Sequence, residues 1–241
     1  MRLTLDLSRA RVETKYGVAA DDVPALLARI SADEREEYGI RSLYFDRPDG
    51  SLARAAVADP LHCTKVRARE YPGDSAVWFE VKTRRGRWTR KSRLHLHRSE
   101  AAALFGGCPF AALPSGGGEE EHEARRYLQD VVGGALVPIG VVRSFRQTFV
   151  LKRPPMRITL DREIAYFRPE THPFSPDGSE RPSLLLRREP EPVLEVKHGG
   201  QLAPWLEELV SGLRPSTYSK FRNLVRFLAE AERTTRRVDR F

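Results

Sequence analysis

Charged side chains recur at every second position in several segments of this sequence that have the composition of β-strands. Because alternate side chains of a strand share one face, each segment would have one charged face and one apolar face. Val66 and Ala68 fall on the apolar face of one segment, and Leu94 and Leu96 on that of another. The charged faces consist of Arg11, Glu13 and Lys15; Lys65, Arg67 and Arg69; Glu80 and Lys82; Lys91, Arg93, His95 and His97; Arg157, Thr159 and Asp161; and Glu195 and Lys197.

Strand faces of this kind have two explanations. Taken singly, each face is typical of the solvated side of a half-buried antiparallel sheet. Taken together, the faces favour a second arrangement, because arginine and lysine dominate strand after strand, where a solvated face normally mixes them with threonine, serine and glutamine. A closed barrel with its apolar side outward, covered by amphipathic helices, would gather these cations around a shared lumen.

Cations gathered in a lumen need an anionic occupant, because like charges placed close together repel one another and are costly to bury unpaired. Phosphate chains fit this need. Each phosphate offers several acceptor oxygens, arginine supplies a planar fork of donors, and lysine supplies a compact charge. The few carboxylates would then hold a divalent ion, Mg²⁺ or Mn²⁺, that bridges carboxylate and phosphate oxygens. The pattern therefore indicates an enzyme that handles phosphate chains.

The elements that would position these residues are mostly strands. Strands are expected at 11–17, 40–46, 63–71, 76–84, 88–97, 140–151, 156–162 and 191–198. Helices are expected after Asp21-Asp22 up to Ile30, and at 100–105, 119–132, 202–211 and 217–233. The stretches 113–118 and 169–192 are predicted to be internal loops of a single domain that spans residues 1–241. The expected fold class is α+β, mainly antiparallel β.

Charge and composition limit the partners and the location. The net charge is +8 and the pI is near 9.8, which favours an anionic partner: phosphate, nucleic acid or an acidic membrane. Two cysteines, Cys63 and Cys108, are too few for a disulfide framework, so we expect a cytoplasmic protein. The sequence shows no signal-peptide core and no run of about 18 apolar residues. A product that has to cross a membrane would need a membrane-protein partner.

Nine short segments resemble, in order along the chain, the motifs of the VTC-domain polyphosphate polymerases, within the triphosphate tunnel metalloenzyme (CYTH-like) superfamily. They are ETKY (13–16), RSLYFD (41–46), KVRARE (65–70), FEVKT (79–83), KSR (91–93), RQTF (146–149), RITLDREI (157–164), LEVKHG (194–199) and YSKF (218–221). The resemblance spans nearly the whole chain. It implies a closed eight-stranded antiparallel β-barrel with helices packed around it, whose basic walls form a tunnel for a triphosphate.

The resemblance also implies roles for the residues that match these motifs. Glu195 is implied to be the metal-binding carboxylate, and Glu13, Glu80 and Asp161 to help in metal binding or in orienting cations. The catalytic residues are implied to be Arg67, Arg69, Arg157 and Glu195, with the γ-phosphate of ATP between the three arginines and the metal. The phosphate ligands are implied to be Lys15, Arg67, Arg69, Lys82, Lys91, Arg93, Arg146, Arg157, Lys197 and Lys220.

The implied activity is transfer of the γ-phosphate of ATP to a growing polyphosphate chain, by positioning and electrostatics. The alternative is a metal-dependent triphosphatase that uses water as acceptor and acts on inorganic triphosphate or a nucleoside triphosphate. The hydrolytic branch typically has ExExK on its first strand, and Arg11 stands where the first of those glutamates would be. A non-catalytic polyphosphate-binding module is a third interpretation, although such a module would gain little from a metal-binding carboxylate such as Glu195.

Some residues are expected to have other roles. Asp46 and Tyr44 would support the barrel, and His95 and His97 would lie at the tunnel mouth or on the surface. Nucleic-acid binding is not expected, because the cations alternate with buried positions and do not line a groove with stacking aromatics. The arginine-rich run 83–93 leaves nucleic acid or an acidic membrane open as partners, although a solvated hairpin turn with two inward cations is the simpler reading.

Overall fold

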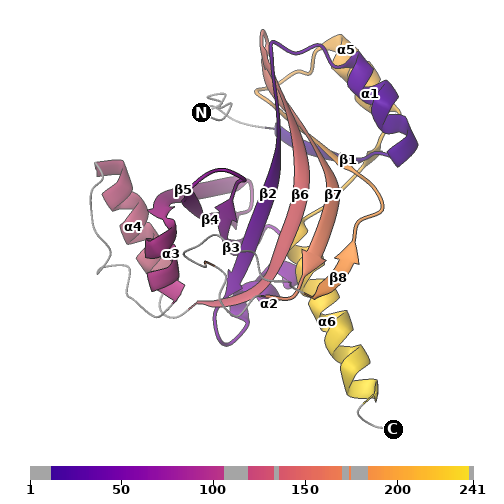
Figure 1. Cartoon of the computed structure of the whole chain (residues 1–241). Coiled ribbons are helices and arrows are strands. Elements are labelled where there is room, and N and C mark those ends of the chain that lie inside the picture. The colour runs from indigo at the N-terminus through magenta and orange to yellow at the C-terminus, as the bar shows by residue number, and fades with distance from the viewer. Residues whose placement is uncertain (1–11, 106–118, 133–135, 170–173, 175–183, 239–241) are drawn as a thin grey trace. The chain divides into compact units, whose positions relative to one another are not determined.

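The computed structural model describes residues 12–105, 119–132, 136–169, 174 and 184–238 (Figure 1). The chain forms two compact units, each assembled from separate stretches of sequence. Unit 1 comprises the described parts of residues 1–40, 143–165 and 188–219, and unit 2 the described parts of 41–142, 166–187 and 220–241. Three long strands contribute residues to both units: β2 (Glu34–Asp46), β6 (Val137–Lys152) and β7 (Pro155–Phe167). The single domain over 1–241 stays a prediction.

The strands form a ten-stranded sheet in the order β10-β1-β9-β7-β6-β2-β3-β4-β5, with β8 paired to β7. This confirms an α+β fold dominated by antiparallel strands. The expected closed eight-stranded barrel is wrong, because the order ends at β10 and at β5 and the described residues contain no ladder that joins these ends. The short β10 (Arg214–Pro215) occupies the outer edge of β1 at Tyr16 and Gly17. At the other end, β5 (Trp88–His97) is rich in arginine and lysine, and such charged side chains make an open sheet edge tolerable.

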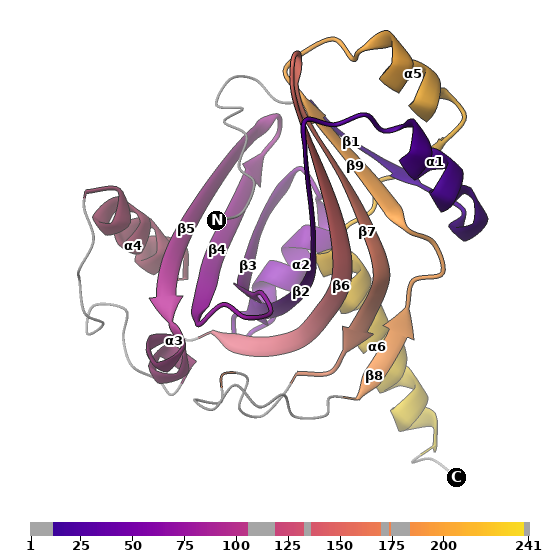
Figure 2. The same ribbon diagram turned by 45° about the horizontal axis from the view of Figure 1, so that its top comes forward.

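Unit 1 packs one apolar sheet face beneath two helices. The strands β1 (Val12–Gly17) and β9 (Val193–His198) lie next to β7, and their alternate apolar residues form a core with residues from α1 (Val23–Arg29) and α5 (Pro204–Ser211). A short 3₁₀ helix, η1 (Ala20–Asp22), leads into α1. Each of the two helices has a proline in its first turn, where no intrahelical N–H is needed. Figure 2 shows α1 and α5 side by side.

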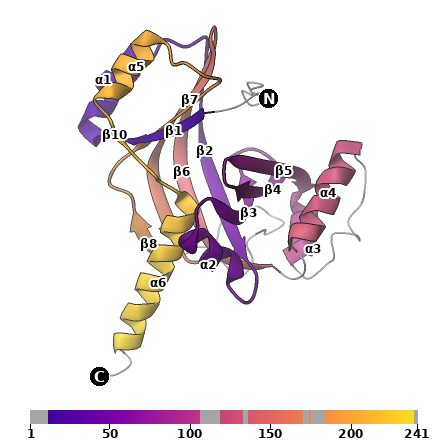
Figure 3. The same ribbon diagram turned by 180° about the vertical axis from the view of Figure 1, so that it is seen from behind.

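Unit 2 contains two successive hairpins, formed by β3 (His62–Glu70), β4 (Ala76–Arg85) and β5. Their apolar faces form a second core with Leu43 and Phe45 of β2. The other elements of this unit are α2 (Ser51–Ala58), α3 (Arg98–Phe105), α4 (Glu119–Val132), β8 (Leu185–Arg188) and α6 (Lys220–Val238). Figure 3 shows α2 beside the first part of α6.

The helix α2 was not expected from the sequence, and a buried aspartate explains how it starts. Gly50 precedes the helix and has no side chain that could cap it. The carboxylate of Asp46 instead accepts hydrogen bonds from the backbone N–H of Leu52 (2.9 Å) and of Ala53 (3.0 Å). These bonds satisfy donors that the first turn of a helix leaves without partners. Asp46 therefore caps α2, whereas from the sequence we expected it to support a barrel.

Other differences from the expected elements have local causes. The strand β2 begins at Glu34, six residues before the expected start, because the polar stretch 34–39 carries no apolar alternation. The strand β8 lies within the predicted loop 169–192, and most of the remaining loop, like the loop 113–118, lies outside the described residues. In the part of the chain that is described, no helix combines the length and apolar character needed to cross a membrane.

Candidate phosphate-binding site

The charged faces of β3, β4 and β5 in unit 2 are aligned in rows that cross the three strands. Their antiparallel register places the residues of each row directly opposite one another. The rows are Lys65, Lys82 and Lys91; Arg67, Glu80 and Arg93; and Arg69, Trp78 and His95. The two-residue spacing between rows keeps them on one face of the sheet, as the sequence predicted.

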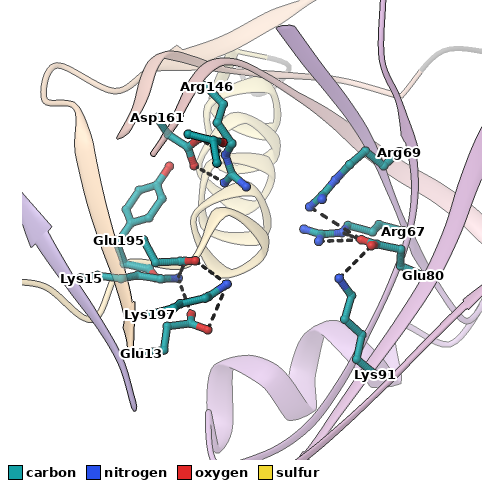
Figure 4. A network of polar contacts seen from close by, with 12 residues as sticks. Glu13, Lys15, Arg67, Arg69, Glu80, Lys91, Arg146, Asp161, Glu195 and Lys197 are labelled. Atoms are coloured by element: carbon teal, nitrogen blue, oxygen red, sulfur yellow. Dashed lines mark hydrogen bonds and ion pairs between the residues drawn. The ribbon is translucent and has the colours of Figure 1, made fainter. Parts of the chain in front are cut away.

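Glu80 lies at the centre of this face and is contacted by four cations. Its Oε2 is 2.6 Å from Nη2 of Arg67 and 3.7 Å from Nη2 of Arg69. Its Oε1 is 2.8 Å from Nζ of Lys91 and 2.7 Å from Nε of Arg93. The side chain of Glu80 is only 3% exposed (Figure 4). We call these five residues the Glu80 cluster.

Protonation in the Glu80 cluster reflects the excess of positive charge. Burial alone would raise the pKa of Glu80, but the neighbouring cations, led by Arg67, hold that pKa well below its usual range. Burial lowers the pKa of Lys91 to about 6; Glu80 opposes this change, but the nearby arginines add to it. Burial would lower the pKa of Arg67, but Glu80 and Tyr44 together raise it. One carboxylate therefore does not balance the cations around it, and a further anion would.

Unit 1 contains a second cluster, in which charges of both signs alternate between β1 and β9. The register places Lys15 opposite Glu195 and Glu13 opposite Lys197. Nζ of Lys197 is 2.6 Å from Glu195 and 3.5 Å from Glu13. Nζ of Lys15 is 3.4 Å from Glu195 and 3.6 Å from Glu13 (Figure 4). Two lysines thus share two carboxylates, and we call these four residues the paired cluster.

The paired cluster holds Glu195 ionised and Lys15 charged. Burial would raise the pKa of Glu195, but Lys197 and Lys15 keep it well below its usual range. Burial would lower the pKa of Lys15, but Glu195 and Glu13 raise it. Lys15 also donates a hydrogen bond to the backbone oxygen of Tyr218 at 3.2 Å, which links the YSKF segment to the first strand.

Arg146 and Asp161 form a bidentate ion pair in the same unit. Nε and Nη2 of Arg146 on β6 donate to the two carboxylate oxygens of Asp161 on β7, both at 2.7 Å. Burial would lower the pKa of Arg146, but Asp161, with smaller contributions from Glu195 and Tyr38, raises it. This fork geometry is specific to arginine and orients the guanidinium group.

The carboxylates differ in how well they could hold a divalent ion. The described residues contain no group of three histidine, cysteine, aspartate or glutamate side chains suited to a metal site made by protein alone. Mg²⁺ usually needs only one or two carboxylates when phosphate oxygens and water complete its shell. Glu13 and Glu195 fit this mode, because they share the same two lysines and so lie close together. Glu80 and Asp161 fit it less well, because arginine or lysine lies 2.6–2.8 Å from both oxygens of each. Three of the four lysine contacts of Glu13 and Glu195 are 3.4 Å or longer.

The remaining predicted ligands differ in their exposure and in the element that carries them. Arg157 on β7 is half-buried and stands opposite Lys197. Lys82 is exposed on β4, and Lys220 is the half-buried first residue of α6. His95 packs against the ring of Trp78, with centroids 4.6 Å apart. Arg11 lies outside the described residues, and the convergence of all the charged faces on one lumen stays a prediction.

One buried ion pair was not anticipated from the sequence. Glu70 contacts Nη1 of Arg41, its cross-strand neighbour, and lies 2.7 Å from Nη1 of Arg98. Arg41 and Glu70 belong to the apolar faces of β2 and β3, where an unpaired charge would be costly. An acid at such a position is a signal that a buried partner exists, but the sequence does not say which residue it is.

Comparisons with solved structures agree with this fold. HpAC1 from Hippeastrum, a candidate adenylyl cyclase described as having a dominant triphosphatase activity, is 16% identical over 89% of this chain and 94% of its own, with a TM-score of 0.55. A candidate adenylate cyclase from Bacillus halodurans is 15% identical over 89% of this chain and 97% of its own, with a TM-score of 0.54. At these identities the likeness shows the fold alone.

The VTC domain model matches residues 10–229, and the chain therefore belongs to the VTC-domain family. This confirms the family that the ordered motifs predicted. No curated protein matches the sequence.

Proposed function

We propose that this protein is a polyphosphate polymerase that transfers the γ-phosphate of ATP to a growing polyphosphate chain, assisted by a divalent ion. The observation that carries the proposal is the Glu80 cluster, in which three arginines and Lys91 surround one buried carboxylate. Such a surface needs a polyanion to balance it. Membership of the VTC-domain family supports polyphosphate as that polyanion.

In this proposal, the Glu80 cluster binds the phosphate oxygens. A guanidinium group has five N–H donors, so Arg67 and Arg69 can each bind Glu80 and still donate to a phosphate. Arg67 is also oriented by the hydroxyl group of Tyr44, 3.4 Å from its Nη1. Donors that are held in place before the substrate arrives stabilise charge that develops during transfer without having to reorganise. Arg93 and Lys91 would add further positive charge.

The unit 1 residues have complementary roles in the proposal. Glu195 and Glu13 would hold Mg²⁺ or Mn²⁺, and such an ion neutralises charge on a phosphate chain when it is bound. Lys15, Lys197 and Arg157 would bind phosphate oxygens. Asp161 would orient Arg146 rather than bind the metal, because both of its oxygens accept hydrogen bonds from that arginine.

The chemical step needs no covalent intermediate on the protein. An oxygen of the acceptor phosphate forms a bond to the γ-phosphorus, the bond from that phosphorus to the β–γ bridging oxygen breaks, and ADP leaves with the electron pair. The side chains named above position the two phosphates and stabilise the charge that spreads over the transferred group. Lys65, Lys82 and Lys220 would bind further phosphates of the lengthening chain.

A triphosphatase is the second candidate function. The structural likeness to HpAC1, described as having a dominant triphosphatase activity, favours it. The same cations would bind the triphosphate, and water would replace the acceptor phosphate. The two activities therefore differ in the acceptor and not in the residues that hold the substrate.

The product distinguishes these functions. Purified protein is incubated with ATP and Mn²⁺ or Mg²⁺, and the products are separated on a gel that resolves polyphosphate. A polymerase yields polyphosphate and ADP, whereas orthophosphate as the sole inorganic product would assign a triphosphatase. Binding of polyphosphate with neither product would leave a non-catalytic binding module. Arg69→Gln should abolish most activity, while Arg84→Gln, at an exposed position on the neighbouring strand, is the matched control and should not.

A further inference from the structure

The turn between β4 and β5 exposes a tryptophan beside a leucine. Trp88 is 73% exposed and Leu61 is 47% exposed. The turn between the strands is made at Gly86, whose positive φ of 57° suits glycine. The backbone N–H of Gly86 donates to the carbonyl oxygen of Leu61 at 2.9 Å, so the segment that carries Leu61 is fastened to the turn. Two apolar side chains therefore project from one connected surface.

Three exposed arginines surround this apolar pair. Nε of Arg84 donates to the carbonyl oxygen of Gly86, and Nη1 of Arg85 donates to that of Arg84, both at 3.0 Å. The guanidinium group of Arg87 lies 5.8 Å from the centre of the Trp88 ring. Among the described carboxylates, none forms an ion pair with these three arginines. We call Leu61, Arg84, Arg85, Arg87 and Trp88 the hairpin patch.

We propose that the hairpin patch docks the protein on an anionic lipid bilayer. Tryptophan prefers the interface between headgroups and acyl chains, where its ring is in an apolar setting and its N–H is solvated. Arginines beside it are attracted to acidic headgroups. The proposal goes beyond phosphate transfer, because the hairpin patch contains no residue of either cluster. It would place an enzyme that acts on phosphate chains at a membrane surface.

Nucleic acid is the less favoured partner for this surface. Proteins that bind single strands stack successive bases on several aromatic side chains along a basic groove. The hairpin patch offers one indole ring, already close to Arg87, next to an aliphatic side chain. A leucine contributes nothing to base stacking but does contribute to insertion between lipids.

Vesicle sedimentation tests the proposal. The full chain should bind vesicles that contain phosphatidylserine, bind weakly to vesicles of phosphatidylcholine alone, and dissociate as salt is added. The triple variant Arg84→Ser, Arg85→Ser, Arg87→Ser should bind the anionic vesicles on the order of 100-fold more weakly. The control Arg29→Ser, Lys152→Ser, Arg214→Ser removes the same charge from surface ion pairs and should bind as the wild type does.

Trp88 provides a second readout. Its fluorescence should shift to shorter wavelength on binding and be quenched by brominated lipid, and Trp88→Ser should abolish both changes while the protein stays folded by circular dichroism. Arg69→Gln should bind vesicles normally, which separates this surface from the phosphate site.

Three results would overturn the proposal. Equal binding to neutral and anionic vesicles would exclude recognition of headgroup charge, and an equal loss in the charge-matched control would show a mere effect of net charge. Binding of single-stranded RNA that the arginine variant loses, without vesicle binding at the same salt, would assign the surface to nucleic acid.

Discussion

The paired cluster of unit 1 and the Glu80 cluster of unit 2 are built from the same residue types but differ in charge balance. In the paired cluster, two lysines face two glutamates across adjacent strands. In the Glu80 cluster, three arginines and Lys91 surround one glutamate. The first cluster is close to neutral, and the second carries an excess of positive charge.

This difference indicates that the two clusters have different roles in the proposed function. In the proposed function, the carboxylates of the balanced cluster take up a divalent ion in place of lysine contacts, and the phosphate chain compensates the ion and the released lysines. The single carboxylate of the Glu80 cluster instead orders the basic side chains around it, and in the proposed function their surplus charge binds phosphate. The comparison predicts that loss of the carboxylate will impair folding most in the Glu80 cluster and catalysis most in the paired cluster.

The largest effect on stability is expected from Glu80→Gln. Loss of this buried charge leaves three arginines and Lys91 without their shared partner, and breaking a buried ion pair typically costs about 3–5 kcal/mol of unfolding free energy. Urea denaturation measures this loss. Tripolyphosphate should restore part of the lost stability, because a ligand that binds only the folded state stabilises that state.

Glu208→Gln, in an exposed pair with Arg29, is the control and should change stability by less than about 1 kcal/mol. Equal stability of the two variants would contradict the role of Glu80.

Glu195→Gln, in contrast, should impair catalysis more than stability. A bound metal ion contributes several kcal/mol of charge stabilisation in the transition state, so we expect kcat/KM to fall by about 100-fold or more. The concentration of Mn²⁺ needed for half-maximal activity should also rise. Initial rates over a metal titration measure both effects. Glu207→Gln, exposed on α5, provides the matched control. A variant that loses stability but keeps its metal dependence would refute metal binding by Glu195.

Arg146→Lys tests whether the fork geometry matters in unit 1. Lysine keeps the charge but cannot make the two parallel hydrogen bonds to Asp161, so we expect a loss of about 2 kcal/mol in unfolding free energy. Arg226→Lys, whose original pair with Glu230 is exposed and 3.8 Å long, should change stability little. If both substitutions have the same effect, Asp161 does not require a bidentate partner and is available for another role.

The sequence predicts the faces of the strands well and their partners poorly. Alternation alone places Arg67, Arg69 and Glu80 on charged faces, because the side-chain period of a strand is two. The row that brings Glu80 beside Arg67 and Arg93 depends on the register of two hairpins, which the turns set. The contacts of Glu80 with several basic side chains at once therefore could not be predicted from its motif.

Whether the sheet closes into a barrel cannot be predicted from local sequence patterns. It depends on strand tilt and stagger, and on pairing between segments that are far apart in the sequence. The outer edge of β1 is taken by Arg214 and Pro215, two residues with no strand pattern of their own. The helix α2 was missed for a similar reason, since its capping group, Asp46, belongs to the preceding strand.

The smallest expected effect concerns the pH dependence of phosphate binding, in which Lys91 of the Glu80 cluster should differ from Lys15 of the paired cluster. In the free protein the pKa of Lys91 is lowered to about 6, so this lysine is largely neutral above that pH. A bound polyphosphate would raise this pKa, and binding would then take up a proton. Lys91 should therefore strengthen binding fully below pH 6, and its contribution should be lost as the pH rises through the pKa of the bound state.

Isothermal titration of tripolyphosphate in buffers of different ionisation enthalpy measures this proton uptake. Lys91→Arg keeps its charge at all these pH values, so it should bind without the extra proton and up to about fivefold more tightly than the wild type above pH 6. Because both proteins receive the same ligand, its own titration cancels in the comparison. Lys15→Arg should leave proton uptake unchanged, since the glutamates of the paired cluster already raise the pKa of Lys15 and keep it charged. Proton uptake that is lost in Lys15→Arg and retained in Lys91→Arg would reverse the assignment of surplus and balanced charge to the two clusters.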